Sequence, residues 1–339
     1  PGGAADSGIV VVDNTGGPAI PVGAFVLDSG SSNYVTRSGQ GAVDAGFYFY
    51  RLAPLGSNQY ALISAPDGEA FEFAEFGSGT SDIWYTTTGT MLERTGDIRD
   101  TFYGPEGQRG WAVWLKAVGA SVNRDVTQST TSAGTTFTFD TSYHQETAAI
   151  IGGIDFTGGS SAGRGWAFGV DAGYVDADMS FDNSPTRFDL TGTVLGVYAT
   201  WTGGGFYLDG TVNANFLKVN LQQPSIPGLP SPFSDDGQIR TYGAQLETGY
   251  RFGWGQNAYF EPMAIFSYAR TTFDDFTLPG GSATFDDGTS MRAAVGARIG
   301  GQMVRDLYTV RASIYGRVWD EFNEDGQVAT INTGGGAFV

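Results

Sequence analysis

The sequence predicts an all-β protein built around a transmembrane antiparallel β-barrel. Glycine is abundant, with 52 residues in 339, while aromatic residues make up 14% of the chain and charged residues only 16%. From about residue 110 onward, polar and apolar side chains alternate with a period of two, and short turns alternate with long loops. Short strands joined by glycine-rich turns account for this composition, and sorting of loops by length is typical of an outer-membrane barrel.

The composition also narrows the function classes. A formal net charge of -18 argues against nucleic acid as a partner, because a surface that binds phosphates is basic. The absence of cysteine excludes thiolate metal sites and disulfides, and it suits export through an oxidising periplasm. No apolar run approaches the ~18 residues of a transmembrane helix, whereas barrel strands distribute their apolar residues in alternation. Pro1 is not a start residue and no signal segment follows it, so we expect an internal part of a longer precursor.

Residues 1–68 form the first of three zones that we expect along the chain. Segments rich in Gly, Ser, Asn and Asp separate four predicted strands, which are Gly8–Asp13, Gly23–Asp28, Ala45–Leu52 and Gln59–Ile63. Each strand is too short to enclose a core of its own, so we expect the strands to stack as rungs. The first zone is therefore predicted to be the end of a β-helix.

Residues 69–108 are predicted to be a linker with one helix, from about Thr80 to Arg99. Thr80 or Ser81 would cap its start, and mixed charges gather at its end. Gly89 and three successive threonines weaken the helix propensity, so a surface helix between two domains remains an alternative. Because small residues fit a narrow pore and no clean apolar stripe is present, we expect the helix to span the barrel. The predicted pore-helix residues are Trp84, Met91, Arg94, Asp97 and Arg99.

Residues 109–339 are predicted to be the barrel, with about nine strands. Between Phe206 and Phe216 the even positions are apolar or glycine, and most odd positions are polar. Such alternation turns one face toward lipid and the other toward the lumen. The predicted lipid-facing residues are Phe206, Leu208, Val212, Phe216, Tyr242, Leu246, Tyr250 and Phe252. The predicted lumen-lining residues are Asp209, Asn213, Glu247, Arg251, Glu261, Arg292, Arg298, Arg311 and Arg317.

Loop lengths favour this barrel over a soluble sandwich, since period-two alternation fits both. Short turns alternate with long polar loops, which lie at 126–142, 222–238 and 272–288. A helix that crosses the pore once delivers residues 1–68 to the far end, so we expect the long loops on that same side. Aromatic residues near strand ends suit interfacial girdles. They are Trp111, Trp166, Trp201, Trp254, Tyr259 and Trp319.

The first two zones resemble one protein family. Val43–Leu52 followed by Gln59–Leu62 resembles the junction at the end of autotransporter passengers whose stem is a pertactin-like β-helix, often called the autochaperone region. Met91–Arg99 resembles the linker helix that leads into the barrel of these type V secretion proteins.

The third zone resembles the same family. Segments similar to strand motifs of the autotransporter β-domain occur in their usual order, at Tyr198–Trp201 with Gly205–Asp209, Phe260–Pro262 and Arg292–Gly300. The family pattern has twelve strands, so we expect a barrel truncated at its C-terminus. Some members cleave their passenger through paired Asn or Asp residues on the helix, and this chain has no matching motif.

The resemblance implies an outer-membrane translocator that exports its own N-terminal passenger to the cell surface. Its implied partners are outer-membrane lipid and lipopolysaccharide, the barrel-insertion machinery and the passenger, without a cofactor and without nucleic acid. The N-terminal segment would lie on the extracellular surface. The passenger itself would be an adhesin, an enzyme or a surface-layer component.

Two other functions remain as alternatives. A porin-like channel would also have charged lumen residues, although it needs no β-helix stem. A surface protease would use His144, the only histidine, with Asp140 nearby, but a lone loop histidine far more often has no catalytic role. The acidic pairs Asp235–Asp236, Asp274–Asp275 and Asp286–Asp287 lack the pattern of a calcium loop. We therefore expect no enzyme and no metal site.

Overall fold

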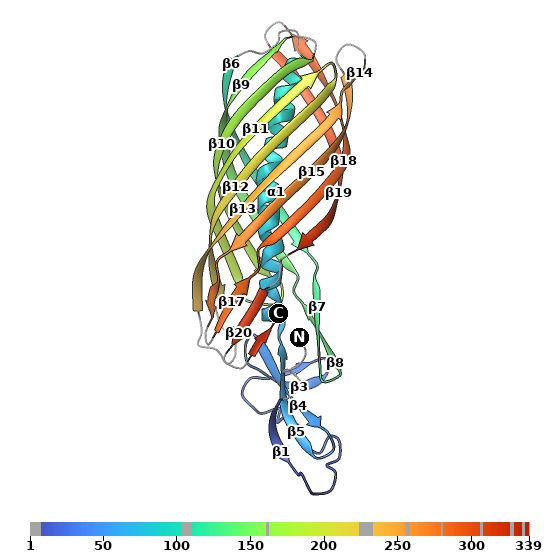
Figure 1. The fold of residues 1–339 in the computed structure, drawn as a ribbon, viewed down its shortest axis with the longest axis vertical. Helices are drawn as coiled ribbons and strands as arrows, with labels where there is room; N and C mark the ends of the chain where they lie inside the picture. The colour runs from blue at the N-terminus through green and yellow to red at the C-terminus, as the bar shows by residue number, and fades with distance from the viewer. Residues whose placement is uncertain are drawn as a thin grey trace.

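A computed structural model of the chain describes residues 8–103, 110–160, 163–223, 233–254, 258–278, 281–305, 308–325, 329–333 and 336–338. A curled sheet surrounds one long helix, and a smaller sheet lies beyond one end of that helix (Figure 1). No helix in the described part of the chain is both long and apolar enough to cross a membrane. Much of the predicted loop at 222–238 falls outside the described residues.

Residues 8–66, which we call the stem, form one five-stranded antiparallel sheet with the order β1-β5-β4-β3-β2. Its strands are β1 (Ile9–Asp13), β2 (Tyr34–Arg37), β3 (Gln40–Asp44), β4 (Tyr48–Leu55) and β5 (Gln59–Pro66). Tight turns set this pairing. Ser38 and Gly39 have φ of 47° and 77°, as a two-residue hairpin turn requires, so β2 and β3 run antiparallel. The stem therefore differs from the stacked rungs expected from the sequence.

The predicted strand Gly23–Asp28 is wrong, because these residues form turns and irregular backbone. This segment is held by contacts with Tyr60 instead of by the backbone hydrogen bonds of a strand. The backbone N–H of Gly23 donates to the Tyr60 hydroxyl at 2.9 Å, and the Phe25 ring lies edge-on to Tyr60 at 5.4 Å. Side-chain contacts of this kind have no sequence periodicity, so alternation could not reveal them.

The wall of the barrel consists of nine long strands and one short one, all antiparallel to their neighbours. In spatial order they are β6 (Gly110–Arg124), β9 (Tyr143–Ser160), β10 (Arg164–Phe181), β11 (Arg187–Gly203), β12 (Phe206–Gln223), β13 (Phe233–Tyr250), β15 (Ala258–Phe273), β18 (Gly288–Arg305) and β19 (Tyr308–Asp325), with β14 (Phe252–Trp254) pairing with β15. Within the described residues β6 and β19 do not pair, so the wall is a curled, open sheet.

The half of the wall near the short turns, which we call the lower part although Figure 1 draws it at the top, has an apolar outer face. The predicted lipid-facing residues lie on this face, and all are exposed except the half-buried Phe216. From Phe206 to Phe216 the chain makes ten residue steps, which at about 3.3 Å per step and a tilt of about 45° give a band about 23 Å tall. That height matches the ~25 Å apolar band of an outer-membrane barrel.

The pattern inverts in the upper part of the wall. Just after Phe216, Leu217, Val219 and Leu221 are buried inside, whereas Lys218 is exposed outside. The same inversion occurs in β10, where Val175 and its apolar successors point inward and acidic residues point outward. An apolar interior with a polar exterior is the arrangement of a protein in water. The wall therefore extends beyond the apolar band at the end nearer the stem.

Two small sheets are built from the long loops at the stem end of the wall, which is drawn at the bottom of Figure 1. The loop after β6 folds into a hairpin of β7 (Thr127–Ser132) and β8 (Thr135–Asp140). The loop after β15 contributes β16 (Phe276–Leu278) and β17 (Gly281–Phe285). In the same sheet β17 pairs with β20 (Ala329–Thr333), and β20 pairs with β21 (Gly336–Phe338), two strands that follow β19 in the chain. The predicted long loops at 126–142 and 272–288 thus lie at the same end as the stem.

The helix α1 runs from Gly68 to Phe102, which is 35 residues. The prediction of a helix at 80–99 placed its start too late, because Asp67 and not Thr80 is the N-cap. Several threonines donate their hydroxyls to carbonyls of the preceding turn, as Thr87 does to Trp84 at 3.0 Å. Packing against a surrounding wall stabilises a helix whose own propensity is low, and no sequence window contains that packing.

Candidate functional site

The candidate site is the interior of the barrel wall together with the helix that occupies it. Nearly the whole helix surface is covered by the wall, and Glu93 and Asp97 are its only exposed residues. The contacts differ along the helix and fall into an aromatic upper level, a mixed middle level and an ionic lower level. Figure 1 shows the helix passing from the stem to the end of the wall where the short turns lie.

The upper level is an aromatic cluster between the helix and the loop sheet. Phe76 stacks on Phe188 of β11 at 4.3 Å, and Phe73 lies edge-on to the same ring at 5.8 Å. Phe276 and Phe285 of the loop sheet contact both helix rings. This cluster closes the upper end of the interior with apolar side chains.

The middle level combines one large ring with polar contacts. Trp84 is fully buried against Gly243, where an added Cβ would lie 2.2 Å from the indole. The Tyr85 hydroxyl lies 2.6 Å from that of Ser290, and the Arg292 guanidinium lies 3.8 Å from the Tyr85 ring centroid. The helix is therefore held by close packing of an indole ring against a glycine of β13 and by polar contacts with β18.

The lower level is centred on Arg99, which is buried. Its guanidinium bonds Glu261 at 3.0 Å and Glu247 at 3.2 Å, and it also pairs with Asp209. The Tyr207 ring lies under the same guanidinium at 3.7 Å. A buried cation is tolerated only with partners of this kind, because an unpaired one loses its hydration without compensation.

Further pairs extend this lower level into a network. Asp100 accepts from Arg251 at 2.6 Å and from Arg298 at 2.7 Å. Arg251 also bonds Glu261 at 2.6 Å, and Arg317 bonds Glu247 at 3.2 Å. Four arginines (Arg99, Arg251, Arg298 and Arg317) meet four carboxylates (Asp100, Asp209, Glu247 and Glu261), so the charges of these eight side chains balance.

A second ion pair joins the helix to the opposite part of the wall. Arg94 pairs with Asp155 of β9, which also accepts the Tyr198 hydroxyl of β11. The same hydroxyl accepts a hydrogen bond from the Trp114 indole at 2.7 Å, and the Arg94 guanidinium lies 5.7 Å from the Trp114 ring centroid. The lower helix is thus bonded to β9 on one side and to β12, β13 and β15 on the other.

The open side of the wall faces the two exposed helix residues. Lys116 of β6 lies 3.1 Å from Glu93 and 3.8 Å from Asp97. From the other edge, the Tyr315 hydroxyl of β19 donates to Glu93 at 3.2 Å. Exposed pairs of this kind contribute little to stability compared with the buried network.

The structure places most predicted lumen residues on the inner face. Asp209, Asn213, Glu247, Arg251 and Glu261 are buried there. Arg292, Arg298 and Arg317 are half-buried on the same face. Arg311 has the same alternation as Arg317 on the edge strand β19 and pairs in register with Gln302, and it is exposed near the short-turn end of that strand.

The predicted pore-helix residues fall into two groups, those in contact with the wall and one at its open side. Trp84, Met91 and Arg99 are buried, and Arg94 is paired with the wall, whereas Asp97 faces the opening.

The predicted aromatic girdle is correct in part. Trp111, Trp166, Trp201 and Trp254 are exposed on the outer face near the short turns. Tyr259 and Trp319 instead lie on the inner face, where an arginine lies over each ring, Arg251 over Tyr259 at 3.8 Å and Arg292 over Trp319 at 5.0 Å. Both arginines belong to the predicted lumen set, and each makes a cation–π contact with one of these inward rings.

The residues considered for catalysis and metal binding have structural partners. His144 lies 2.6 Å from Asn123 and 3.3 Å from Glu146, while Asp140 accepts from the backbone of Ser142. Each acidic pair contains a residue bonded to a protein donor, for example Asp287 to Arg270 at 2.7 Å. Among the described residues, no group of three or more His, Cys, Asp or Glu could hold a metal ion.

Three residues that contact the predicted site residues were not among those predicted from the sequence, namely Asp155, Asp100 and Tyr207. Asp155 lies between the outward-facing Ile154 and Phe156, so the alternation rule that found Asp209 could have found it. Asp100 lies one residue beyond the predicted helix, so the prediction did not include it. Tyr207 is the aromatic exception among the polar odd positions of Phe206–Phe216, and its place under Arg99 depends on the fold.

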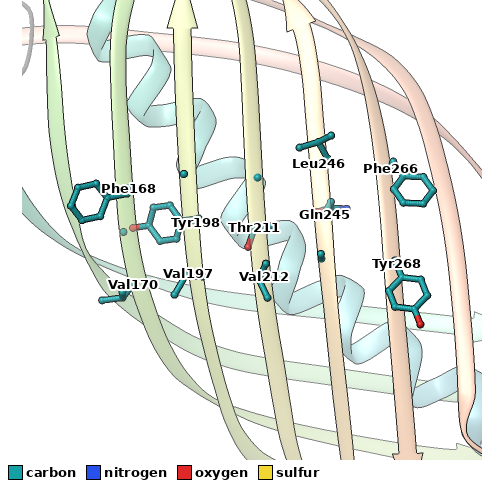
Figure 2. Close-up of a pocket in the computed structure, with 14 residues that line it drawn as sticks. Phe168, Val170, Val197, Tyr198, Thr211, Val212, Gln245, Leu246, Phe266 and Tyr268 are labelled. Carbon is teal, nitrogen blue, oxygen red and sulfur yellow. The ribbon is translucent and has the colours of Figure 1, made fainter.

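The outer face of the wall carries an apolar groove of about 550 Å³ across β10, β11, β12, β13 and β15. Figure 2 shows its lining side chains in front of the helix. Small residues, Ala199, Gly210 and Ala244, line it between larger ones such as Phe168 and Leu246. The groove lies within the apolar band, whereas Tyr198, Thr211 and Gln245 of the same strands are buried toward the helix.

Comparison with known proteins agrees with this architecture. The family model described as "Autotransporter beta-domain" matches residues 113–339, which is more than half of the chain. The pertactin autotransporter of Bordetella bronchiseptica is 26% identical over 357 residues, covering 88% of this chain and 36% of that protein. That of Bordetella parapertussis is 28% identical over 262 residues, covering 74% and 25%.

One solved structure is also similar. The β-domain of the Bordetella autotransporter BrkA has a TM-score of 0.48 and 21% identity, and the match covers 65% of this chain and 82% of that one. The chain spans about a third or less of the length of the curated relatives it matches. On the family match, this chain belongs to the autotransporter β-domain family, whose members in general translocate a passenger across the outer membrane.

Proposed function

We propose that this chain is an outer-membrane translocator that exports its own N-terminal passenger, of which the stem is the base. One observation carries the proposal. The chain passes directly from the stem into the interior as α1, and the next strand in the sequence is the wall strand β6. A helix of 35 residues is about 52 Å long at 1.5 Å per residue, which exceeds the apolar band, so the stem is delivered beyond the membrane.

The proposed orientation puts the stem outside the cell. Long loops and the inverted, water-adapted part of the wall lie at the stem end, and outer-membrane barrels have their longer loops on the extracellular side. Just above the apolar band, Lys218 and Arg270 are exposed on the outer face, and Arg240 lies half-buried between them. Cations at that height suit the phosphates of lipopolysaccharide, the lipid partner we propose.

The proposed energy source is folding of the passenger outside the cell, since no nucleotide site is predicted. Strands that pair outside bury apolar surface and so oppose backward sliding. The alternative of a porin-like channel is less well supported, because side chains of the helix fill the interior. We propose the barrel-insertion machinery as a further partner, and no catalytic role for this part of the protein.

Cysteine labelling tests the orientation cleanly because the chain has no cysteine. Val26→Cys lies in the stem and Arg164→Cys lies at the short-turn end, and both positions are exposed. A membrane-impermeant maleimide on intact cells should label the first variant and not the second. Both should react after the outer membrane is permeabilised. Labelling of Arg164→Cys alone on intact cells would overturn the proposal.

A further inference from the structure

The hairpin β7–β8 leaves the barrel wall and lies against the stem. It pairs with neither the wall nor the stem sheet among the described strands, and forms a two-stranded sheet of its own. Ala133 and Gly134 close it with φ of 42° and 73°, which fits a two-residue turn. An isolated two-stranded hairpin is marginal in water, so its contacts with the stem matter for both parts.

One face of the hairpin is covered, and it carries two phenylalanines of β8 that contact the stem. Phe137, which is 1% exposed, lies edge-on to the stem residue Phe49 at 4.8 Å. Phe139 contacts Phe49 at 6.2 Å and the helix residue Phe71 at 5.7 Å. On the opposite face, Thr138 and its neighbours Ser129, Thr131 and Thr136 are exposed. The two aromatic side chains of the hairpin are therefore on the side that the stem and the helix cover.

A buried arginine fixes how the two parts meet. Arg51 of β4 donates to the backbone carbonyls of Ser132 at 2.6 Å and Ala133 at 3.0 Å, across 81 and 82 positions of sequence. Its guanidinium also lies 5.6 Å from the Phe137 ring centroid. Backbone carbonyls at a hairpin tip can be reached in one alignment only, so these bonds set the position of the stem on the hairpin.

The stem cannot complete this core without the barrel. The apolar cluster at the contact consists of Ala42, Phe49 and Ala65 from the stem and Phe137 from the hairpin. A sheet of five short strands buries too little surface to be stable alone, and here a residue from the barrel loop supplies the missing cover. The stem directly precedes the helix, so on leaving the pore it is the first passenger segment to reach the hairpin.

We propose that β7–β8 is a folding template of the barrel, on which the passenger stem assembles as it emerges. The partner it recognises is an extended apolar segment with an arginine at the Arg51 position. This inference rests on the proposed export function, but its test does not require export. The test unfolds and refolds residues 8–66 in the purified full chain in detergent, at a urea concentration chosen so that the barrel stays folded.

Pulse proteolysis of residues 8–66 measures both rates. Phe137→Ser should slow refolding of the stem about tenfold or more, because a template contact is already formed in the transition state. Thr138→Ser, on the exposed face of the same strand, should refold at the unchanged rate. Arg51→Gln lies outside the barrel and should also slow refolding, which keeps the test valid if Phe137→Ser impairs barrel assembly.

Two results would overturn the template. One is unchanged refolding with faster unfolding in both Phe137→Ser and Arg51→Gln, which is the behaviour of a contact made late in folding. The other is no change in either rate. If the stem refolds as expected in detergent but Val26→Cys is not labelled on intact cells, then the export proposal fails while the template stands.

Discussion

The guanidinium of Arg99 bonds the carboxylate of Glu261 at 3.0 Å, and both groups are buried. The two residues are 162 positions apart, one on the helix and one on β15. This ion pair therefore forms only when the wall has assembled around the helix. Removing one partner would leave the other charge buried without compensation, which makes the pair a sensitive probe of helix seating.

Arg99→Met is expected to lower the free energy of unfolding by about 3–5 kcal/mol, because three carboxylates would lose their shared cation. The temperature at which the folded barrel loses its compact mobility in SDS gel electrophoresis measures the change. Lys116→Met, which removes the exposed pair with Glu93, should cost at most about 1 kcal/mol. Equal shifts in the two variants would contradict the assignment of Arg99 as the central cation.

Removal of the helix is expected to open an ion-conducting channel. The buried Trp84 and Met91 occupy the interior, and the wall around them is lined by polar groups that would hold water once the helix is absent. Conductance in planar bilayers should be higher for a chain that begins at Gly110 than for one that begins at Gly68. If the two chains conduct equally, the helix is not a plug.

A size-compensation pair tests the lower end of the helix. An added Cβ at Gly165 of β10 would lie 2.6 Å from the Phe102 ring, so Gly165→Ala should cost about 1–3 kcal/mol. Phe102→Leu should recover part of that loss by withdrawing the ring edge. Gly253→Ala is the control, since a Cβ there meets nothing within 4 Å. A double variant that is less stable than Gly165→Ala alone would show that the two residues do not share this contact.

The stem should become less stable as the pH rises from about 5 to 8.5. Glu69 lies in the first helical turn beside the stem, above the apolar band, and burial there raises its pKa to about 8, with Asp67 adding to the shift. Because its pKa is higher in the folded state, the folded state holds a proton that the unfolded chain has lost in this pH window. Stability is therefore full below the ordinary value near 4.5 and falls as pH approaches 8.

Glu69→Gln removes this titration and should flatten the pH dependence. The urea midpoint for pulse proteolysis of residues 8–66, measured at pH 5 and at pH 8.5, reports the effect. Asp28→Asn, in an exposed turn of the stem, should retain the dependence of the parent chain. A parallel fall in the midpoint for Glu69→Gln and the parent would exclude Glu69 as its source.

Local alternation was enough to predict the wall and much of the site. In Phe206–Phe216 each residue's face follows from its position, because successive side chains of a strand point to opposite sides. Asp209 and Asn213 were therefore placed correctly on the inner face. The adjacent apolar pair Phe216 and Leu217 marks the point where the pattern inverts, but which side then holds the core depends on the loop sheet that covers it.

The sequence by itself determined that this chain makes strands with alternating polar and apolar residues, a helix without a continuous apolar stripe, and short turns that alternate with long loops. Each of these is a local property of the backbone and its neighbours. Only the tertiary structure decided that the helix begins at Gly68, since the wall supplies the packing its residues lack. It also decided which charges meet: Arg99 with Asp209, Glu247 and Glu261, and Arg94 with Asp155. Ion pairs between segments more than 60 positions apart depend on how the sheet curls around the helix, and that curvature is a property of the assembled strands.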